Sequence, residues 1–278
     1  MTSKAIQVRY EWAQSIARRA GKKALALFRA REQLVIESKG PQDVVSAADR
    51  DIEREIRAEV TACFADDGFL GEEGGLERGD ARFLWVIDPI DGTACFLGGM
   101  HAWCLSIGVM CEGKPVIGVV YDPNSDEMFH ARDGSGAYVD GKPARVIDAG
   151  GLDEGLLGVG FSHRVPVSAF MPFMDRLLSQ GGMFMRNGSG ALMLAYVASG
   201  RLIGYFEPHM NAWDCVAGLV LVREAGGVVN DFLAGDGLIQ GNPIVAAGPR
   251  LYPALCAAID PPLAAGSQAQ NAATFSST

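Results

Sequence analysis

The chain has 278 residues, of which 49% are hydrophobic and 21% charged, and its formal net charge at pH 7 is −9. This length and composition suit either one large globular domain or two closely packed halves. The acidic balance argues against nucleic acid or an anionic membrane as a bulk partner. It does not argue against a small anionic substrate, because bound cations would reverse the local field.

Targeting signals and a disulfide pattern are both absent from the sequence. Residues 1–10 lack the apolar core of a secretory signal, and no run of eighteen apolar residues occurs, which predicts a soluble, cytoplasmic protein without a membrane partner. The six cysteines show no C-x-x-C spacing and lie mostly in apolar stretches, as is typical of buried, reduced thiols; they are residues 63, 95, 104, 111, 215 and 256.

The first part of the chain shows two helical patterns. Apolar residues at three- and four-residue spacing predict amphipathic helices over residues 5–28 and 46–64, and Asp49 falls in the first turn of the second helix. Between these helices, residues 34–37 are a short strand candidate, and residues 39–43 are rich in turn formers and predict a loop.

A β-rich stretch follows, and then helices and strands alternate. The predicted strands cover residues 85–87, 103–111, 115–121, 127–131, 136–139, 203–207 and 244–247. The predicted helices of the second half cover residues 170–179, 191–199, 213–222 and 249–259. We expect a single domain over residues 1–260, with an α+β half to about residue 145 and an α/β half from about residue 146, and a disordered tail over residues 261–278.

The most informative run is Asp88-Pro89-Ile90-Asp91-Gly92-Thr93, directly after the short buried strand. Pro89 is expected to force the chain out of the strand ladder, and Gly92 to permit a tight turn. Two carboxylates and a backbone carbonyl then meet at one point, which suits a hard divalent cation that prefers oxygen ligands. A phosphate-cleaving enzyme needs such a cation.

Two further acidic positions are each weak signals alone. Glu72 lies in a glycine-flanked pair of acids, as often occurs in surface loops, and Asp214 begins an apolar helix, where an acid often serves only as a cap. Together with Asp88 and Asp91, these residues would give two or three Mg²⁺ ions a set of carboxylate ligands.

The order of these three motifs, Gly-Glu-Glu at residues 71–73, the run at residues 88–93 and Trp-Asp at residues 213–214, resembles the inositol monophosphatase family. The resemblance extends over residues 39–227. It implies a layered α-β-α-β-α sandwich and Mg²⁺-dependent hydrolysis of a small phosphate monoester by an activated water, without a phosphoenzyme. It also implies a homodimer and inhibition by lithium.

The resemblance assigns metal ligands position by position. Glu72, Asp88 and the carbonyl of Ile90 match a first metal site in this family, and Asp88, Asp91 and Asp214 match a second. The resemblance implies a catalytic role for Glu72 in addition to its role as a metal ligand.

The resemblance also assigns catalytic roles around the attacking water. Thr93 matches the residue that orients this water and helps to deprotonate it, and Asp49 matches the acid that hydrogen-bonds this threonine. Gly92 and Thr93 would offer backbone N–H groups to the phosphate.

Other positions match residues around the substrate. Glu207 matches a carboxylate that accepts hydrogen bonds from substrate hydroxyls, and Gly188 and Ser189 match the segment that holds the sugar or cyclitol ring. Asp91 and Asp214 border the substrate as well as the metal ions.

Two departures from the family pattern leave the substrate open. Many members carry Asn-Phe after the central motif, where this chain has Ala94-Cys95-Phe96. Many also have a proline before Trp213, where this chain has Glu-Pro-His-Met-Asn-Ala at residues 207–212. His209, in this second stretch, is the one histidine expected near the substrate. Inositol-1-phosphate is the default substrate; histidinol phosphate, fructose-1,6-bisphosphate and adenosine 3′,5′-bisphosphate are alternatives. An inactive relative that binds or regulates is the alternative from another class.

Overall fold

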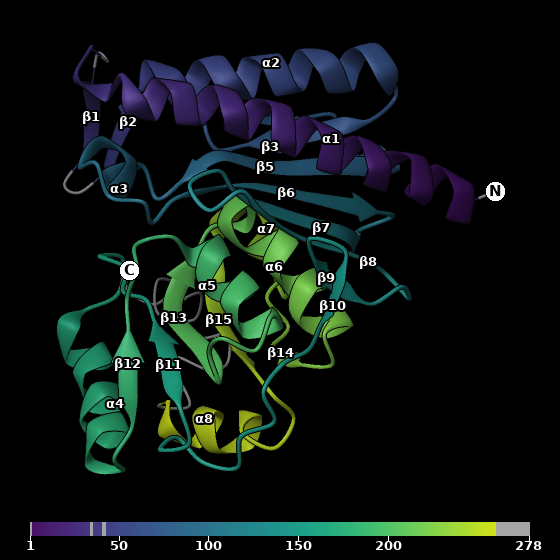
Figure 1. The fold of residues 1–278 in the computed structure, drawn as a ribbon. Coiled ribbons are helices and arrows are strands. Elements are labelled where there is room, and N and C mark those ends of the chain that lie inside the picture. Colours follow the sequence, from purple (N-terminus) through teal and green to yellow (C-terminus); the bar gives the residue numbers. More distant parts are fainter. Residues whose placement is uncertain (1, 34–35, 41–42, 260–278) are drawn as a thin grey trace, which may run out of the picture.

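The computed structural model of the chain describes residues 2–33, 36–40 and 43–259, which form alternating layers of helices and sheets (Figure 1). The predicted strand over residues 34–37 and the predicted loop over residues 39–43 lie only partly within this range. In the described part, β1 (Ile36–Gly40) and β2 (Asp43–Ser46) pair antiparallel, so residues 39, 40 and 43 belong to strands and the loop prediction is wrong there. The predicted tail over residues 261–278 lies outside the described residues.

Two long helices form the first layer. They are α1 (Thr2–Arg29) and α2 (Ala47–Cys63), and they confirm the helices predicted over residues 5–28 and 46–64. Ile16 of α1 and Ile52 of α2 are each 1% exposed, in a core shared with the large sheet below. Both helices therefore follow from their apolar spacing, which places one stripe against the sheet.

An ion pair attaches α1 to the large sheet. The Arg9 guanidinium lies 2.6 Å from Oδ1 of buried Asp67, and Oδ2 of Asp67 accepts a hydrogen bond of 2.8 Å from the Trp85 indole. Because the carboxylate has donors on both oxygens, this buried charge is compensated.

The second layer is an eight-stranded sheet with the order β10-β9-β8-β7-β6-β5-β3-β4. Its strands are β3 (Gly68–Gly71), β4 (Gly75–Glu77), β5 (Phe83–Asp91), β6 (Cys104–Cys111), β7 (Lys114–Asp122), β8 (Glu127–Arg132), β9 (Ala137–Val139) and β10 (Lys142–Ala144). The predicted strands in β6 to β9 are confirmed, whereas β3, β4 and β10 were not predicted because three or four residues show too little periodicity. β3 and β5 run parallel, and the other pairs in this sheet are antiparallel.

β5 is longer than predicted: Pro89 leaves the ladder, as expected, but the strand pairs with β6 again at Asp91. β5 spans Phe83–Asp91, and its register against β6 shifts between the pairs Asp88↔Ser106 and Asp91↔Cys104. The extra residue on β5 forms a bulge, which accommodates a proline that has no N–H to donate. The expected tight turn follows directly, since Gly92 has φ 97°.

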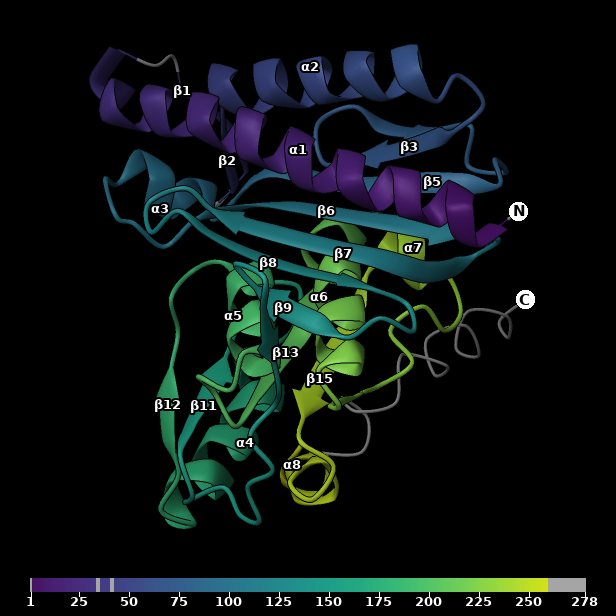
Figure 2. The same cartoon turned by 45° about the vertical axis from the view of Figure 1, so that its right-hand side comes forward.

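The remaining three layers come from the second half of the chain. The inner helices α5 (Gly190–Ala198) and α6 (Ala212–Glu224) lie between the large sheet and a five-stranded sheet, as the turned view shows (Figure 2). This second sheet has the order β12-β11-β13-β15-β14 and consists of β11 (Leu156–Val159), β12 (Met183–Met185), β13 (Gly204–Met210), β14 (Val228–Val229) and β15 (Asn242–Ala247). The outer helices α4 (Val167–Ser179) and α8 (Tyr252–Ala258) complete the fold.

The layers run α-β-α-β-α, which confirms the sandwich that the resemblance implies (Figure 1). Three short helices connect these layers: η1 (Arg31–Gln33), α3 (Thr93–Leu97) and α7 (Gly237–Gln240). The large sheet ends at β10 and the second sheet begins at β11. Within the described part of the chain, no helix has the length and apolar character that a bilayer crossing requires.

Strand direction determines where polar groups gather. β11, β12 and β13 are parallel, so their carboxyl ends lie at one edge of the second sheet, as those of β3 and β5 do in the large sheet. Residues that follow all five strands line one cavity. The fold therefore creates a crevice at strand carboxyl ends, where α/β proteins commonly bind ligands.

Candidate active site

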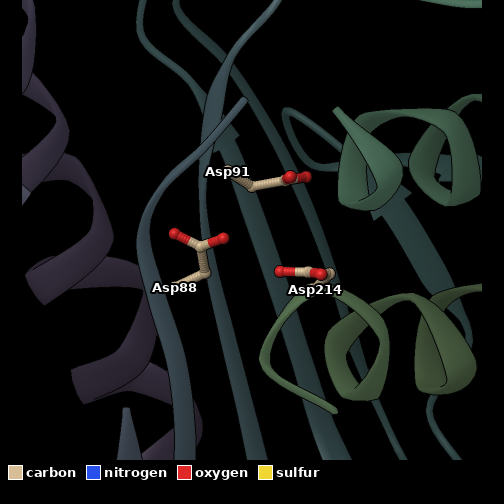
Figure 3. Close-up of side chains that lie close together, drawn as sticks. All are labelled: Asp88, Asp91 and Asp214. Carbon is tan, nitrogen blue, oxygen red and sulfur yellow. The ribbon is translucent and has the colours of Figure 1, made fainter. Parts of the chain in front are cut away.

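Three carboxylates converge at the base of this cavity. Asp88 and Asp91 lie at the end of β5, Asp214 lies in the first turn of α6, and one carboxylate oxygen from each lies within 4.8 Å of the other two (Figure 3). We call these three residues the acidic corner. The structure thus brings Asp214 next to the Asp88–Asp91 pair, although Asp214 and Asp91 lie 123 positions apart in the sequence.

Backbone and hydroxyl donors orient two of these carboxylates. Oδ2 of Asp91 accepts a hydrogen bond of 2.6 Å from the Ser189 hydroxyl and one of 2.7 Å from the N–H of Ala191, at the N-terminus of α5. Oδ1 of Asp88 accepts one of 2.8 Å from the N–H of Ile90, across the bulge. These bonds fix the carboxylates before any ligand arrives, and the α5 dipole favours the charge on Asp91.

The acidic corner is electrostatically unfavourable without a counter-charge. Burial, together with the neighbouring charges of Glu72, Asp214 and Asp91, raises the pKa of Asp88 well above its ordinary value. Burial and the charge of Asp91 raise the pKa of Asp214, and burial raises the pKa of Asp91 to about 6 despite its hydrogen bonds. These carboxyl groups favour protons or cations.

The donor set fits a hard divalent cation. Every ligand that the acidic corner offers is a carboxylate oxygen, which suits Mg²⁺ and related ions and does not suit soft metals. The nearest sulfur, in Cys104, lies 3.9 Å from Oδ2 of Asp91, and burial raises the pKa of this thiol well above its ordinary value. Cys104 is therefore a neutral neighbour and no thiolate ligand.

Glu72 lies beside the acidic corner but outside the group of three. It follows Gly71, which pairs with Ile87 across β3 and β5, so Glu72 comes next to Asp88 in the parallel register. Its N–H donates to the Ile87 carbonyl at 3.3 Å, its charge contributes to the raised pKa of Asp88, and it lines the cavity. The predicted ligand thus lies on the same side of the cavity as Asp88.

A buried glutamate supports the turn that carries Glu72. Glu53 of α2 is 3% exposed and accepts hydrogen bonds of 2.8 Å from the N–H groups of Glu73 and Gly74. A Cβ atom at Gly74 would lie 2.7 Å from the Glu53 carboxylate, so the close approach requires glycine there. Glu53 therefore connects the position of this turn to α2.

Thr93, Asp49 and the Ile90 carbonyl meet next to this corner. The Thr93 hydroxyl lies 3.2 Å from Oδ1 of buried Asp49 and 3.1 Å from the Ile90 carbonyl oxygen. A hydroxyl carries one hydrogen, so it donates to one of these acceptors at a time. The structure therefore contains the Thr93–Asp49 hydrogen bond that the resemblance implies, and the catalytic roles of these residues stay predictions.

The cavity above the acidic corner is large and polar. It has a volume of about 1000 Å³. Its lining includes all of the predicted substrate residues: Asp91, Gly92, Thr93, Gly188, Ser189, Glu207 and Asp214. His209 and Cys95 also line it. Burial raises the pKa of Glu207 to about 7, so its carboxyl group titrates near neutral pH.

The sequence analysis missed three polar groups in the cavity wall. Arg164 follows β11, Arg186 follows β12 and Asn211 follows β13. Recognising β11 and β12 as strands parallel to β13 would have placed all three at the same sheet edge. The sequence pattern does not predict these two strands, because each spans only three or four residues.

Comparisons with known proteins agree with this fold. The model of the inositol monophosphatase family matches residues 6–261. A Nus factor SuhB from Xylella fastidiosa is 41% identical over 222 residues, covering 79% of this chain and 80% of that protein. An inositol-1-monophosphatase from Mesorhizobium japonicum is 37% identical over 252 residues, covering 90% of this chain and 95% of that protein.

The solved structures include an extragenic suppressor protein SuhB from Bartonella henselae, with a TM-score of 0.84 and 32% identity, covering 94% of this chain and 99% of that one. The layered fold and its cavity are thus those of a class of phosphoric monoester hydrolases. Within this class, the chain belongs to the inositol monophosphatase family.

The contact between Glu53 and the Glu72 turn generates a first prediction. Replacing Glu53→Gln removes the charge and one of the two acceptors, so we expect the Mg²⁺ concentration for half-maximal phosphate release to rise about 10-fold, as for residues that support metal ligands. Glu55→Gln, on an exposed position of the same helix, is the matched control and should leave it unchanged. An equal Mg²⁺ requirement in both variants would show that Glu53 does not position Glu72.

The raised pKa values generate a second prediction. A carboxyl group with a pKa raised in the folded state stabilises the fold below its unfolded pKa, near 4, and this contribution is lost as the pH rises through the folded value. The melting temperature of metal-free protein should therefore fall from pH 5 to pH 8, and Mg²⁺ should restore it more at pH 8. A difference of about 3 °C, which corresponds to about 1 kcal/mol in a protein of this size, would be measurable by calorimetry. Asp214→Asn should reduce the pH dependence; an unchanged profile would contradict the electrostatic argument.

Proposed function

We propose that this protein hydrolyses a small phosphate monoester with the help of Mg²⁺. The observation that carries the proposal is the acidic corner, whose buried carboxylates need cations and lie at the base of a cavity of about 1000 Å³. Asp88, Asp91, Asp214 and Glu72 would hold two or three Mg²⁺ ions, together with the Ile90 carbonyl. When bound, these ions supply positive charge for the phosphoryl oxygens and lower the pKa of a water.

The chain's own groups would prepare the attack. Thr93 would donate its hydrogen to Asp49, so that the Thr93 oxygen accepts a hydrogen bond from the attacking water and orients it. Asp49, buried and bonded to Thr93, would stabilise the hydroxyl in this orientation. The N–H groups of Gly92 and Thr93 would donate to the phosphate, and no covalent phosphoenzyme is required.

The rest of the cavity would bind the alcohol part of the substrate. Glu207 accepts a hydrogen bond from the buried Tyr205 hydroxyl, which orients its carboxylate toward the cavity that it lines. A substrate hydroxyl would donate to Glu207, and Gly188 and Ser189 would contact the ring. The name of the Mesorhizobium relative supports inositol-1-phosphate as the default substrate; histidinol phosphate, fructose-1,6-bisphosphate and adenosine 3′,5′-bisphosphate are alternatives. Lithium would inhibit the reaction.

Loss of one carboxylate charge should abolish catalysis. Replacing Asp91→Asn removes a charge from the acidic corner while an amide oxygen can still accept from Ser189 and Ala191. We expect the rate of phosphate release from inositol-1-phosphate to fall at least about 10²–10³-fold, the range for removing one electrostatic stabiliser, with the melting temperature nearly unchanged. Asp80→Asn, on an exposed residue, is the control.

The same measurement of phosphate release distinguishes an active phosphatase from a catalytically inactive relative of the family. The Xylella protein carries the name Nus factor, which is not an enzyme's name, and a binding or regulatory role is therefore the rival proposal. If the unaltered chain releases no phosphate from a panel of sugar and polyol phosphates at saturating Mg²⁺, the enzymatic proposal fails and this rival gains. A net charge of −9 gives direct nucleic-acid binding no support.

We also propose that the protein is a cytoplasmic homodimer. β12 is the edge strand of the second sheet, and it exposes Met183 (67%) and Phe184 (45%) beside Leu156 of β11 (36%). An exposed apolar edge strand is a ready site for pairing with another chain. A second copy of this chain would cover it.

The dimer proposal predicts the effect of one charge at this edge. Phe184→Lys should shift the mass measured by light scattering from that of two chains toward that of one, because a lysine opposes burial of the strand. Ile239→Lys, which alters an exposed apolar residue on α7, is the control and should leave the mass unchanged. A single-chain mass for the unaltered protein would refute the dimer.

A further inference from the structure

The wall that the second sheet contributes to the cavity carries two arginines, Arg164 and Arg186. The charge of Arg186 partly offsets the burial that raises the pKa of Glu207, so these two residues are electrostatic neighbours. Arg164 and Arg186 are exposed and line the cavity, and among the described residues neither forms an ion pair with a carboxylate. Cations bound at the acidic corner would neutralise the acids at the base of the cavity. With Glu207 next to Arg186, the guanidinium charge of Arg164 would then remain for the ligand to compensate.

Arg164 is held in place by two side chains. Its Nη1 lies 2.9 Å from Oδ1 of Asn211 and 3.2 Å from Nδ1 of His209. Nε2 of His209 lies 2.8 Å from the Gln240 carbonyl oxygen, which can only accept, so Nε2 carries the hydrogen. Nδ1 of this neutral imidazole therefore accepts from Arg164, and the guanidinium is fixed rather than free in solvent.

The hydrogen bonds of Arg164 to His209 and Asn211 leave the Nε and Nη2 atoms of its guanidinium available. Both acceptors use Nη1, and no described residue accepts a hydrogen bond from Nε or Nη2. A guanidinium presents its N–H groups in a planar fork that matches the two oxygens of a carboxylate or phosphate. Such a group, fixed and exposed in a cavity wall, is suited to recognise an anion.

Asn211 connects this fork to the acidic corner. Its Oδ1 accepts from Arg164, and its Nδ2 lies 3.5 Å from Oδ2 of Asp214. A single amide side chain therefore separates the guanidinium from a carboxylate at the cavity base. A molecule whose phosphoryl group lies at the acidic corner would have Arg164 close to its alcohol part.

We propose that Arg164, assisted by Arg186, forms a second anion-binding subsite for a carboxylate or second phosphate on the alcohol part of the substrate. This inference rests on the proposed phosphatase function. Among the candidate substrates it favours phosphate monoesters that carry another anionic group, such as fructose-1,6-bisphosphate, over the default inositol-1-phosphate. His209 and Asn211 act as positioning residues for Arg164. A polyol phosphate without a second anionic group would bind without compensating the Arg164 guanidinium.

Two matched pairs of esters test the subsite. Glycerol 3-phosphate and 3-phosphoglycerate differ in replacing a CH₂OH group by a carboxylate, as do the longer sorbitol 6-phosphate and 6-phosphogluconate. With Mg²⁺ present, we expect a higher kcat/KM for the anionic member of at least one pair. Arg164→Gln should lower that kcat/KM about 10-fold, mainly through KM, as for the loss of a charge-assisted hydrogen bond. The value for the neutral member should change less than about 2-fold.

Further variants separate this role from a structural one. His209→Ala should give a smaller loss of the same selectivity, because it frees the Arg164 side chain. Arg145→Gln, on an exposed arginine outside the cavity lining, should change neither ester. Equal losses for both members of a pair would show that Arg164 contacts the shared phosphoryl group, and no loss for either would show that it contacts no ligand; each result overturns the subsite.

Failure of the proposed function would look different. If no ester is hydrolysed, the phosphatase proposal fails, and calorimetric titration of the same pairs into the Mg²⁺-containing protein still decides the subsite. A preference of unaltered protein for the anionic member that Arg164→Gln removes would support the subsite as a binding site. Equal dissociation constants for both members would refute it.

Discussion

Electrostatic repulsion between buried carboxylates is the constraint on which the site depends. One carboxylate oxygen each of Asp88, Asp91 and Asp214 lies within 4.8 Å of the other two. The pKa values of all three carboxyl groups are raised, so the fold alone does not compensate their charges. A protein that only needed stability would gain by replacing such groups with apolar ones. Their presence at the base of a cavity is explained by a ligand that brings positive charge.

The surrounding structure resists this repulsion by fixing each acid from a different element. Asp88 and Asp91 lie on either side of a bulge in β5, and the N-terminus of α5 donates a hydrogen bond to Asp91. Glu53 of α2 supports the turn that carries Glu72. These supports come from the first, second and third layers of the sandwich. The five-layer fold therefore fixes the relative positions of acids whose charges repel one another.

The sequence predicts more of the base of the site than of its walls. Local patterns in the sequence predicted three features. These are the spacing of Asp88 and Asp91, the match to the family at Glu72 and Asp214, and the long amphipathic helices. The structure places these acids together, although their roles stay predictions. Arg164 and Arg186 had no such pattern: each follows a strand of three or four residues, and only the parallel pairing of β11 with β12 and β13 brings them to the cavity.

Pro89 shows a second limit of local rules. A proline usually interrupts a strand ladder, yet here the register shift between Asp88 and Asp91 lets β5 continue for the full nine residues. The bulge has a chemical consequence, because it allows the N–H of Ile90 to reach back to Asp88 while Asp91 turns toward α5. The bulge at the proline thus lets Asp88 and Asp91 meet at the acidic corner, although a regular strand would place residues three apart on opposite faces. The departure from regular structure and the geometry of the acidic corner therefore have one cause.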